Sequence, residues 1–353
     1  MSSPETWLAA RLAEGPIPAA EVMAQALYHP DWGYYRRPEA PWDFQGKDYY
    51  TALDLGPLLG QALARRLQSA WERLDRPPGF TVLEPGAGRG WLGRDLLNAA
   101  EGPFREALRY LHRDDNHAAR AAAAEALAPW LTNGQARMMG ESEPLEPFTG
   151  AVLSNELFDA LPAQPWRWDG TRWVREILTA TGPEWQAAGD GEALPWFELQ
   201  AEEAGGLEPG DGSVWCAAMP AVVRELSTPL QAGLFLAIDY GESTSRLLAK
   251  GADLRRFVSH TVDGEWWRDL GQSDLTADVD FTRLQLLLEN EGWTEVGQGT
   301  LSHWIRTHAP LLEWEAAWLY LDPKLRVKRM ENLLQLTMPG LMGDRFRVLE
   351  AWK

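Results

Sequence analysis

The sequence predicts a doubly wound, Rossmann-like α/β sheet with a helical N-terminal segment and an inserted lobe that contains β-strands. Three observations predict this fold. Short apolar strands alternate with helical stretches from Thr81 onward, and the first strand runs directly into the glycine-rich turn Glu84–Gly90. A strand, a glycine-rich turn and a helix open a nucleotide-binding α/β unit. Roughly 70 residues separate Pro162 from Leu234, which is far more than one crossover connection needs and predicts the insertion.

Composition and charge narrow the class of protein. The chain has 353 residues, of which 45% are apolar and 24% charged, as in ordinary globular proteins. Its 33 basic and 51 acidic residues give a net charge of -18, which would repel a phosphate backbone and argues against nucleic acid as a partner. The single cysteine, Cys216, cannot form an internal disulfide, and the six histidines show no zinc-binding spacing. We therefore expect no metal site.

The N-terminal part of the chain is predicted to be helical. Leu55–Leu74 carries apolar residues close to the spacing of one helical face. Met1–Pro30 lacks a basic start followed by an apolar run, and no stretch approaches the roughly 18 to 20 apolar residues that span a bilayer. We therefore expect a soluble, cytoplasmic protein with no membrane partner.

The predicted core strands share one feature, which is that each ends in acidic or amide residues. In open parallel sheets this carboxyl edge is where ligands bind. The strands are Thr81–Leu83, Ala107–Leu111, Ala151–Ser154 and Leu234–Ile238, and the helices between the first three are Trp91–Ala100 and Ala118–Leu131.

The insertion begins with a hairpin signal. Trp166–Leu178 consists of β-formers on both sides of a turn at Asp169-Gly170. This insertion is either a lid over the ligand edge or a decoration of the fold. We divide the chain into an N-terminal helical segment closing the site (1–75), a first part of the core (76–162), an inserted β-containing lobe (163–230), and a second part of the core with the C-terminal segment (231–353).

The glycine turn predicts the cofactor. Gly86, Gly88 and Gly90 let the backbone turn tightly and approach a ligand that a Cβ would block. A pyrophosphate requires free helix N–H groups and no nearby anion, whereas Glu84 precedes this turn and Asp95 follows it. Acidic surroundings suit a zwitterion or a cation, such as the amino group and sulfonium of S-adenosyl-L-methionine.

Asp114 supports the same interpretation. It stands thirty residues after Glu84, at the end of the second strand, where a carboxylate can accept hydrogen bonds from both hydroxyls of a ribose. The alternative is an N-cap for the following helix, together with Asp115 and Asn116. The turn, its flanking acids and Asp114 together favour a class I methyltransferase over a dehydrogenase.

Several blocks in fixed order resemble one family, the MidA-type class I methyltransferases that depend on S-adenosyl-L-methionine. This family includes a mitochondrial complex I assembly factor that methylates a protein arginine. The resemblance spans about residues 28 to 305, and NELFDALP and DLTADVDF are its most specific motifs. The blocks are His29–Tyr35, Asp48–Thr51, Leu55–Gly60, the glycine turn, Asn155–Pro162 (NELFDALP), Ile238–Gly241 (IDYG) and Asp274–Phe281 (DLTADVDF).

The resemblance implies methylation of a protein side chain, with arginine favoured. Carboxylates would then have to hold a planar guanidinium, and Glu156 and Asp159 are the candidates because they lie one helical turn apart after the third strand. Alternatively, both belong only to the turn. Asn155 is expected to contact the cofactor, or else to be a local turn amide. Thr51 is expected to bind the cofactor and Asp48 to be catalytic, and both would close the site from above. The alternative is that they form a simple surface loop.

Two alternatives stay open, and departures from the family pattern favour the first of them. Asp278 stands where relatives have histidine, Leu53-Asp54 where they have Pro-Glu, and Trp215–Ala218 lacks an acidic residue that relatives carry. The first alternative is a non-catalytic assembly or interaction protein that retains the methyltransferase fold. The second is a nucleotide-dependent oxidoreductase. The sequence makes no prediction of the oligomeric state.

Overall fold

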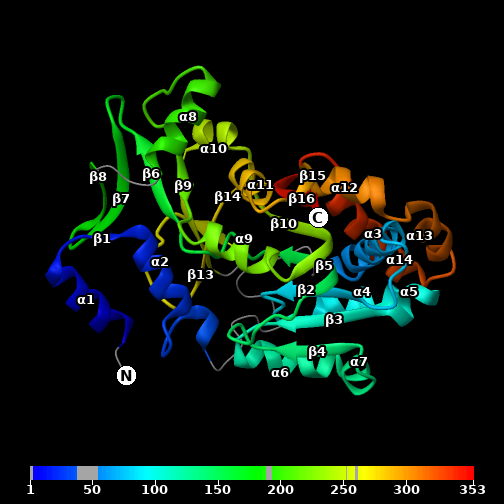
Figure 1. The fold of residues 1–353 in the computed structure, drawn as a ribbon. Helices are drawn as coiled ribbons and strands as arrows, with labels where there is room; N and C mark the ends of the chain where they lie inside the picture. The colour runs from blue at the N-terminus through cyan, green and yellow to red at the C-terminus, as the bar shows by residue number, and fades with distance from the viewer. Residues whose placement is uncertain (1–2, 38–54, 188–192, 252, 259–260) are drawn as a thin grey trace. The chain divides into compact units, whose positions relative to one another are not determined.

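The computed structural model describes residues 3–37, 55–187, 193–251, 253–258 and 261–353 (Figure 1). The chain forms two compact units. The first comprises Met1–Tyr49, Phe158–Val222 and Tyr240–Leu284, and the second comprises Tyr50–Leu157, Val223–Asp239 and Gln285–Lys353. The elements α9 (Met219–Ser227), β10 (Leu230–Glu242) and α11 (Phe281–Asn290) continue from one unit into the other. The four-part division made from the sequence stays a prediction.

The second unit contains the predicted sheet, and its α/β class is confirmed. The strand order is β15-β16-β10-β5-β2-β3-β4. The neighbours from β10 to β4 run parallel, whereas β15 and β16 are antiparallel. Three of the four predicted core strands lie within observed ones, and the fourth, Ala107–Leu111, begins one residue too early, because Ala107 is the last residue of a helix. The bounds are β2 (Phe80–Pro85), β3 (Leu108–Arg113), β4 (Ala136–Met139), β5 (Phe148–Asn155), β15 (Thr294–Thr300) and β16 (Phe346–Trp352).

The helices of the second unit follow the predicted pattern with one exception. The expected helix Leu55–Leu74 is α3 (Leu58–Arg73), which buries the apolar face that its spacing predicts. The prediction of a single helix over Ala118–Leu131 is wrong. The helix is interrupted at Leu127, which separates α6 (His117–Ala126) from α7 (Ala128–Thr132). Pro129 causes the break because it has no N–H to continue the helical ladder. The other helices are α4 (Trp91–Ala99), α5 (Gly102–Ala107), α12 (Leu301–His308), α13 (Leu311–Trp318), α14 (Pro323–Thr337) and α15 (Met342–Arg345).

The first unit contains the inserted strands, which form antiparallel sheets. The predicted hairpin is confirmed, because Trp168 pairs with Trp173 around the turn at Asp169-Gly170. The larger sheet has the order β1-β7-β6-β9 with β8 on β7, and the smaller has the order β12-β11-β13. The bounds are β1 (Ile17–Pro18), β6 (Gln164–Trp168), β7 (Trp173–Thr179), β8 (Gly182–Ala187), β9 (Gly212–Trp215), β11 (Leu254–Val258), β12 (Thr261–Asp263) and β13 (Asp274–Ala277). The short strand β14 (Val279–Asp280) belongs to neither of these sheets and pairs in parallel with the end of β10.

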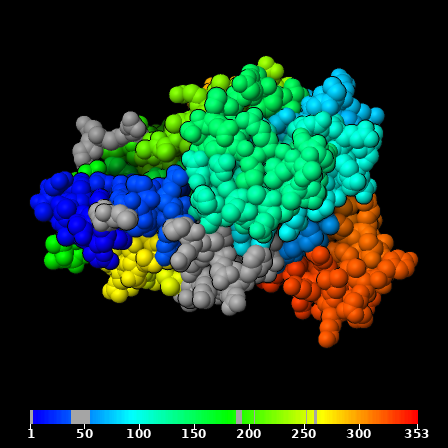
Figure 2. Space-filling model, turned by 90° about the horizontal axis from the view of Figure 1, so that it is seen from below, coloured from blue at the N-terminus to red at the C-terminus, as the bar shows by residue number. Residues whose placement is uncertain are grey.

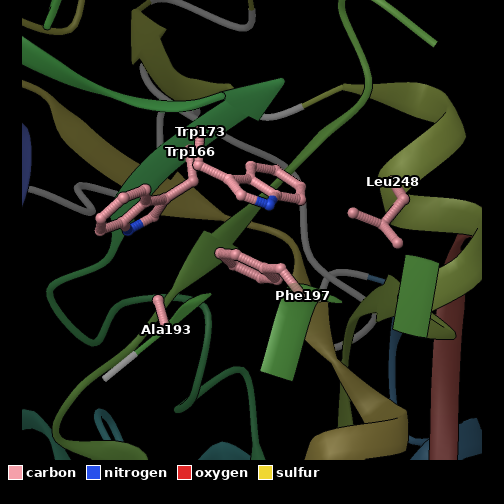
Figure 3. Close-up of a cluster of buried hydrophobic side chains, with 5 residues drawn as sticks. All are labelled: Trp166, Trp173, Ala193, Phe197 and Leu248. Carbon is pink, nitrogen blue, oxygen red and sulfur yellow. The ribbon is translucent and has the colours of Figure 1, made fainter. Parts of the chain in front are cut away.

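Aromatic packing stabilises the larger sheet of the first unit. Trp166 and Trp173 are buried together with Ala193, Phe197 and Leu248, and the two indoles lie around the Phe197 ring (Figure 3). The ring centroids of Trp173 and Phe197 are 5.0 Å apart. These tryptophans are therefore part of the hydrophobic core of the first unit, where large aromatic side chains contribute much of the buried apolar area.

Helices complete the first unit. In the part of the chain that the structure describes, no helix combines the length and apolar character needed to cross a bilayer. The bounds are α1 (Pro4–Glu14), α2 (Ala19–Tyr28), the 3₁₀ turn η1 (Tyr34–Arg36), α8 (Leu194–Ala204) and α10 (Thr244–Lys250).

Candidate cofactor and active site

The candidate site lies in the second unit, at the carboxyl edge of its parallel strands. β10, β5, β2 and β3 are neighbours in that order, so their carboxyl ends meet at one edge. β5 ends at Asn155 beside Ile238 of β10, and β2 ends at Pro85 beside Arg113 of β3. The glycine turn, Asp114, Asn155 and Glu156 therefore all follow strands on the same edge of the sheet.

The three glycines of the turn have different local requirements. All have positive φ angles, +63° at Gly86, +52° at Gly88 and +67° at Gly90. A Cβ on Gly86 would lie 3.0 Å from the Leu157 side chain, and one on Gly90 would lie 3.0 Å from Leu127. A Cβ on Gly88 would meet no atom within 4 Å. Gly86 and Gly90 thus allow close packing, whereas Gly88 borders open space that a ligand can occupy.

Asp114 braces this turn. Its Oδ2 accepts a hydrogen bond from the Gly88 N–H at 2.8 Å, and its Oδ1 accepts one from the Asn116 N–H at 2.7 Å. The N-cap of α6 is Asn116, whose side chain accepts from the Ala119 N–H at 2.8 Å, so the capping alternative for Asp114 is wrong. Asp114 is half-buried, and each carboxylate oxygen has a second lone pair for a ligand hydroxyl. Its contact with a ribose stays a prediction.

Glu84 supports the turn from inside the sheet. Its side chain is 4% exposed and accepts a hydrogen bond from the Tyr110 hydroxyl at 2.6 Å. The pKa of Glu84 is raised to about 8, mainly by burial; the Tyr110 hydrogen bond opposes this shift, and the nearby charge of Asp114 adds to it. Glu84 is therefore largely protonated near neutral pH. Burial therefore opposes the negative charge that Glu84 is expected to supply to the turn; this charge and a direct contact with the cofactor stay predictions.

Asp95, the other acid expected to place negative charge near the turn, also interacts with a side chain of the protein itself. It is buried and forms an ion pair with Arg94 at 2.8 Å. Burial raises the pKa of Asp95, and the Arg94 interaction opposes that shift. Of the acids near the turn, Asp114 is thus the one whose carboxylate touches the glycine backbone.

Replacing Glu84 should change how stability depends on pH. Its pKa is raised in the folded protein, so the folded state holds a proton that the unfolded chain releases near pH 4.5. The free energy of unfolding therefore contains a contribution that falls as pH rises from about 4.5 to about 8, by about 1.4 kcal/mol for each unit of pKa shift. Glu84→Gln removes this contribution, so its stability relative to wild type should improve with pH. Urea unfolding at pH 5.5, 7 and 8.5 measures the difference, and parallel profiles would contradict the assignment.

Asn155 has a buried carbonyl oxygen that lacks a partner. Asn155 is the last residue of β5 and is 9% exposed. Its Nδ2 donates to Glu156 Oε1 at 3.2 Å, whereas its Oδ1 is buried without a hydrogen-bond partner among the described residues. Buried polar atoms are nearly always satisfied, so this oxygen needs a donor from a water molecule or a ligand. The open space at Gly88 and the unsatisfied Asn155 both fit a bound cofactor with hydroxyl and amino groups.

Glu156 has an unusual backbone conformation. Its φ is +51°, a left-handed value that non-glycine residues rarely adopt and that costs roughly 1–2 kcal/mol. Its N–H donates to the Ile238 carbonyl at 2.9 Å, and the next N–H, of Leu157, donates to Asp239 Oδ2 at 3.1 Å. These two bonds to β10 hold the strained turn in place. Such strain is frequent at functional sites.

The helical spacing expected for Glu156 and Asp159 is wrong. Residues 156–161 form bends and turns, because the left-handed Glu156 ends β5 without starting a helix. Glu156 belongs to the second unit and Asp159 to the first. A shared grip on one guanidinium stays a prediction.

Asp159 lies in a charged cluster of the first unit. Its backbone carbonyl accepts from the Ala277 N–H at 3.0 Å. Burial raises the pKa of Asp159 to about 6, the positive charge of Arg255 lowers it, and the negative charge of Asp278 raises it. Asp278 forms ion pairs with Arg255, at 2.7 Å, and with Lys250. The acid that replaces a histidine in the DLTADVDF block is therefore neutralised by two cations.

Two expected site residues cannot be placed. Asp48 and Thr51 lie outside the described residues. Sequence reasoning missed two residues that support the glycine turn, Tyr110 and His112, which lie on the same face of β3. His112 is buried, and its Nε2 lies 2.8 Å from the Gly88 carbonyl oxygen. In the sheet, Tyr110 pairs with Val82 and His112 with Glu84. This pairing places them near the turn, but it can be found only when the register of the two strands is known.

Fold and site together define a class I methyltransferase that uses S-adenosyl-L-methionine. Residues 62–298 match the family model Methyltransf_28, described as an S-adenosyl-L-methionine-dependent methyltransferase. The chain belongs to this family, as the resemblance to MidA-type enzymes predicted.

Known proteins agree with this assignment. The chain is 26% identical to "Protein arginine methyltransferase NDUFAF7 homolog, mitochondrial" of Drosophila melanogaster, over 96% of this chain and 82% of the relative. It is 24% identical to the Homo sapiens NDUFAF7 protein, over 94% and 79%. The crystal structure of a COG1565 superfamily member from Burkholderia thailandensis, bound to S-adenosyl-homocysteine, superposes with a TM-score of 0.83 at 24% identity and covers 99% of this chain and 92% of that one.

The same comparison corrects the expected cytoplasmic location. The curated relatives from Drosophila melanogaster, Danio rerio and Homo sapiens are all named as mitochondrial proteins. The expectation depended on the lack of a recognisable leader in Met1–Pro30, and these relatives overturn it.

Asp114→Ala should weaken cofactor binding. The substitution removes the acceptor for a ribose and also the brace on the Gly88 N–H. Hydrogen bonds to a charged group are typically worth about 1.5 to 3 kcal/mol, so the dissociation constant for S-adenosylmethionine should rise at least about tenfold. Asp115→Ala, one residue further along, is the control and should bind normally. Calorimetry measures both, and unchanged affinity in Asp114→Ala would restrict Asp114 to bracing the turn.

Proposed function

We propose that this methyltransferase acts on arginine side chains of a protein substrate. The chain aligns over nearly its whole length with relatives named as protein arginine methyltransferases, which supports this substrate class. The single structural observation that carries the proposal is Glu156, a carboxylate held in a left-handed turn beside the unsatisfied Asn155 at the ligand edge of the sheet.

A carboxylate at this place suits a guanidinium substrate. A guanidinium is planar and presents paired N–H donors, which a carboxylate binds bidentately. Glu156 would hold the cation and draw its positive charge toward the bound nitrogens, so that another nitrogen keeps the electron pair needed for attack. The Asn155 amide fixes Glu156 Oε1 at 3.2 Å and thereby orients the carboxylate.

The cofactor supplies an electrophilic methyl group on a sulfonium. With the cofactor bound, a guanidinium nitrogen would form the new N–C bond as the C–S bond breaks, the electrons of that bond would stay on the sulfur as a thioether, and the proton of the methylated nitrogen would pass to solvent water. Such a displacement mainly requires that nucleophile and methyl be held about 3 to 3.5 Å apart in line. Residues at the edge of the sheet therefore need to bind and orient rather than react.

The proposal is tested with trideuterated S-adenosylmethionine. Purified protein is incubated with a lysate and the labelled cofactor, and peptides are searched for the heavy methyl group by mass spectrometry. We expect label on arginine, and none when the protein is omitted. Label on another side chain would refute the arginine assignment. Tight cofactor binding without any transfer would instead favour the non-catalytic assembly protein.

A further inference from the structure

Exposed apolar side chains gather on one segment of the second unit. Among the described residues, twelve large apolar side chains are exposed, and nine of them lie between residues 312 and 341, in and around α13 and α14. Tyr320, between these helices, is 91% exposed and Leu312 is 81% exposed. Figure 2 shows this segment in orange, with a large surface open on the face in view. So many exposed apolar side chains on one segment point to an interaction site, because large exposed apolar patches are rare on monomeric proteins.

On α14 the exposed residues form a stripe. Val327, Met330 and Leu334 follow one another at spacings of three and four residues, and Met338 continues the series at the end of the helix. These spacings place them on one face. We call Val327, Met330, Leu334 and Met338 the α14 stripe.

The stripe is not the face that anchors α14 to its own unit. The opposite face buries Leu333 and Leu336, and the buried Asn332 donates from Nδ2 to the Leu55 carbonyl at 2.7 Å. These contacts fix the rotation of the helix about its axis. The stripe residues remain 40% to 55% exposed, so the contacts within this unit leave much of their apolar surface open.

Charge along α14 is unevenly distributed. Lys324, Arg326 and Lys328 occupy its first half, are exposed, and form no ion pair among the described residues. The last turn carries no basic residue, and the only charges from 330 to 344 are the acids Glu331 and Asp344. A helix C-terminus has a partial negative charge that cations stabilise, and this one supplies none of its own.

We propose that the α14 stripe packs against the same stripe of a second copy of this chain, with the two helices antiparallel. A two-fold axis between Met330 and Leu334 then brings Met330 of one copy against Leu334 of the other, and Val327 near Met338. The same arrangement places the basic first half of each helix beside the partner's C-terminal end, which carries the negative end of the helix dipole and no basic residue. A parallel arrangement would bring the two basic halves together. The stripe therefore pairs with itself in apolar positions and in charge, as a two-fold interface requires.

Sedimentation equilibrium of the full chain tests the association. We expect twice the chain mass of 39.6 kDa at micromolar concentrations. Leu334→Glu buries a charge at the axis and should raise the dimer dissociation constant at least about a hundredfold. Leu286→Glu is the matched control, because Leu286 is also exposed on a helix of the same unit but lies outside the stripe, and it should remain dimeric. A wild-type monomer, or a dimer that Leu334→Glu leaves intact, would overturn the proposal.

Cysteine cross-linking tests the antiparallel orientation. The only native cysteine, Cys216, is buried, so background cross-linking is low. Under oxidation, a mixture of Met330→Cys and Leu334→Cys chains should form far more disulfide-linked dimer than either variant alone. Equal self-linking by each variant would indicate a parallel or random encounter and contradict the proposal. A monomer that sediments with phosphatidylglycerol vesicles, or that binds only another protein, would assign the stripe to a different partner and reject the dimer.

Discussion

Gly88→Val is expected to abolish binding of S-adenosylmethionine while the protein stays folded. A Cβ on Gly88 meets no protein atom within 4 Å, so the added side chain would project into the space that the ligand needs. Valine at a φ of +52° also strains the turn by roughly 1 to 2 kcal/mol. We expect the dissociation constant to rise more than about a hundredfold, which corresponds to about 2.8 kcal/mol. Calorimetric titration measures it.

Gly102→Val is the matched control for this experiment. Gly102 has nearly the same φ, +51°, and a Cβ there also meets nothing within 4 Å, but it opens α5 away from the carboxyl edge. The variant should lose a similar amount of stability and bind the cofactor normally. If both variants bind as wild type does, the ligand space is not at Gly88.

Glu156→Gln is expected to slow methyl transfer by roughly 10² to 10³ while the dissociation constant for the cofactor stays near normal. Glutamine keeps the size of the side chain and an acceptor oxygen, but it removes the charge that orients and polarises a guanidinium. An interaction that strengthens mainly in the transition state affects the rate far more than cofactor binding. Single-turnover methylation and calorimetry on the same variant separate the two effects.

Glu125→Gln provides the control for charge alone. Glu125 is exposed on α6 in the same unit, so its replacement changes the net charge identically. It should leave both rate and affinity unchanged. An equal loss of rate and affinity in Glu156→Gln would mark Glu156 as a cofactor ligand or a support for the turn. A wild-type rate would remove it from the catalytic machinery.

The sequence predicted the core of the second unit because each step depended on local signals. β2, β5 and β10 are short apolar runs ended by polar residues, and the glycines at 86, 88 and 90 mark the turn directly. The strand order and the antiparallel β16 could not be predicted, because both depend on pairing between distant segments. Pro129 did carry a local signal for the break between α6 and α7, which the alanine-rich run obscured.

The site was harder to predict because its chemistry depends on burial and register. Glu84 looks like a negative charge near the turn, but its side chain is buried inside the sheet, and this burial raises its pKa to about 8 although the Tyr110 hydrogen bond opposes the shift. The role of Asn116 as the α6 cap, in place of Asp114, depends on which side chain reaches the first free N–H groups. The left-handed Glu156 cannot be anticipated from residue type, since non-glycine residues rarely adopt that conformation.

The measurement that tests the central claim most directly is a crystal structure of this protein with S-adenosyl-homocysteine. The account predicts that the ligand lies at the carboxyl edge of β2, β3 and β5 against the Gly88 backbone. Its ribose hydroxyls should lie within hydrogen-bond distance of Asp114, and a ligand donor should satisfy Asn155 Oδ1. A ligand bound elsewhere, with Asp114 and Asn155 untouched, would contradict it.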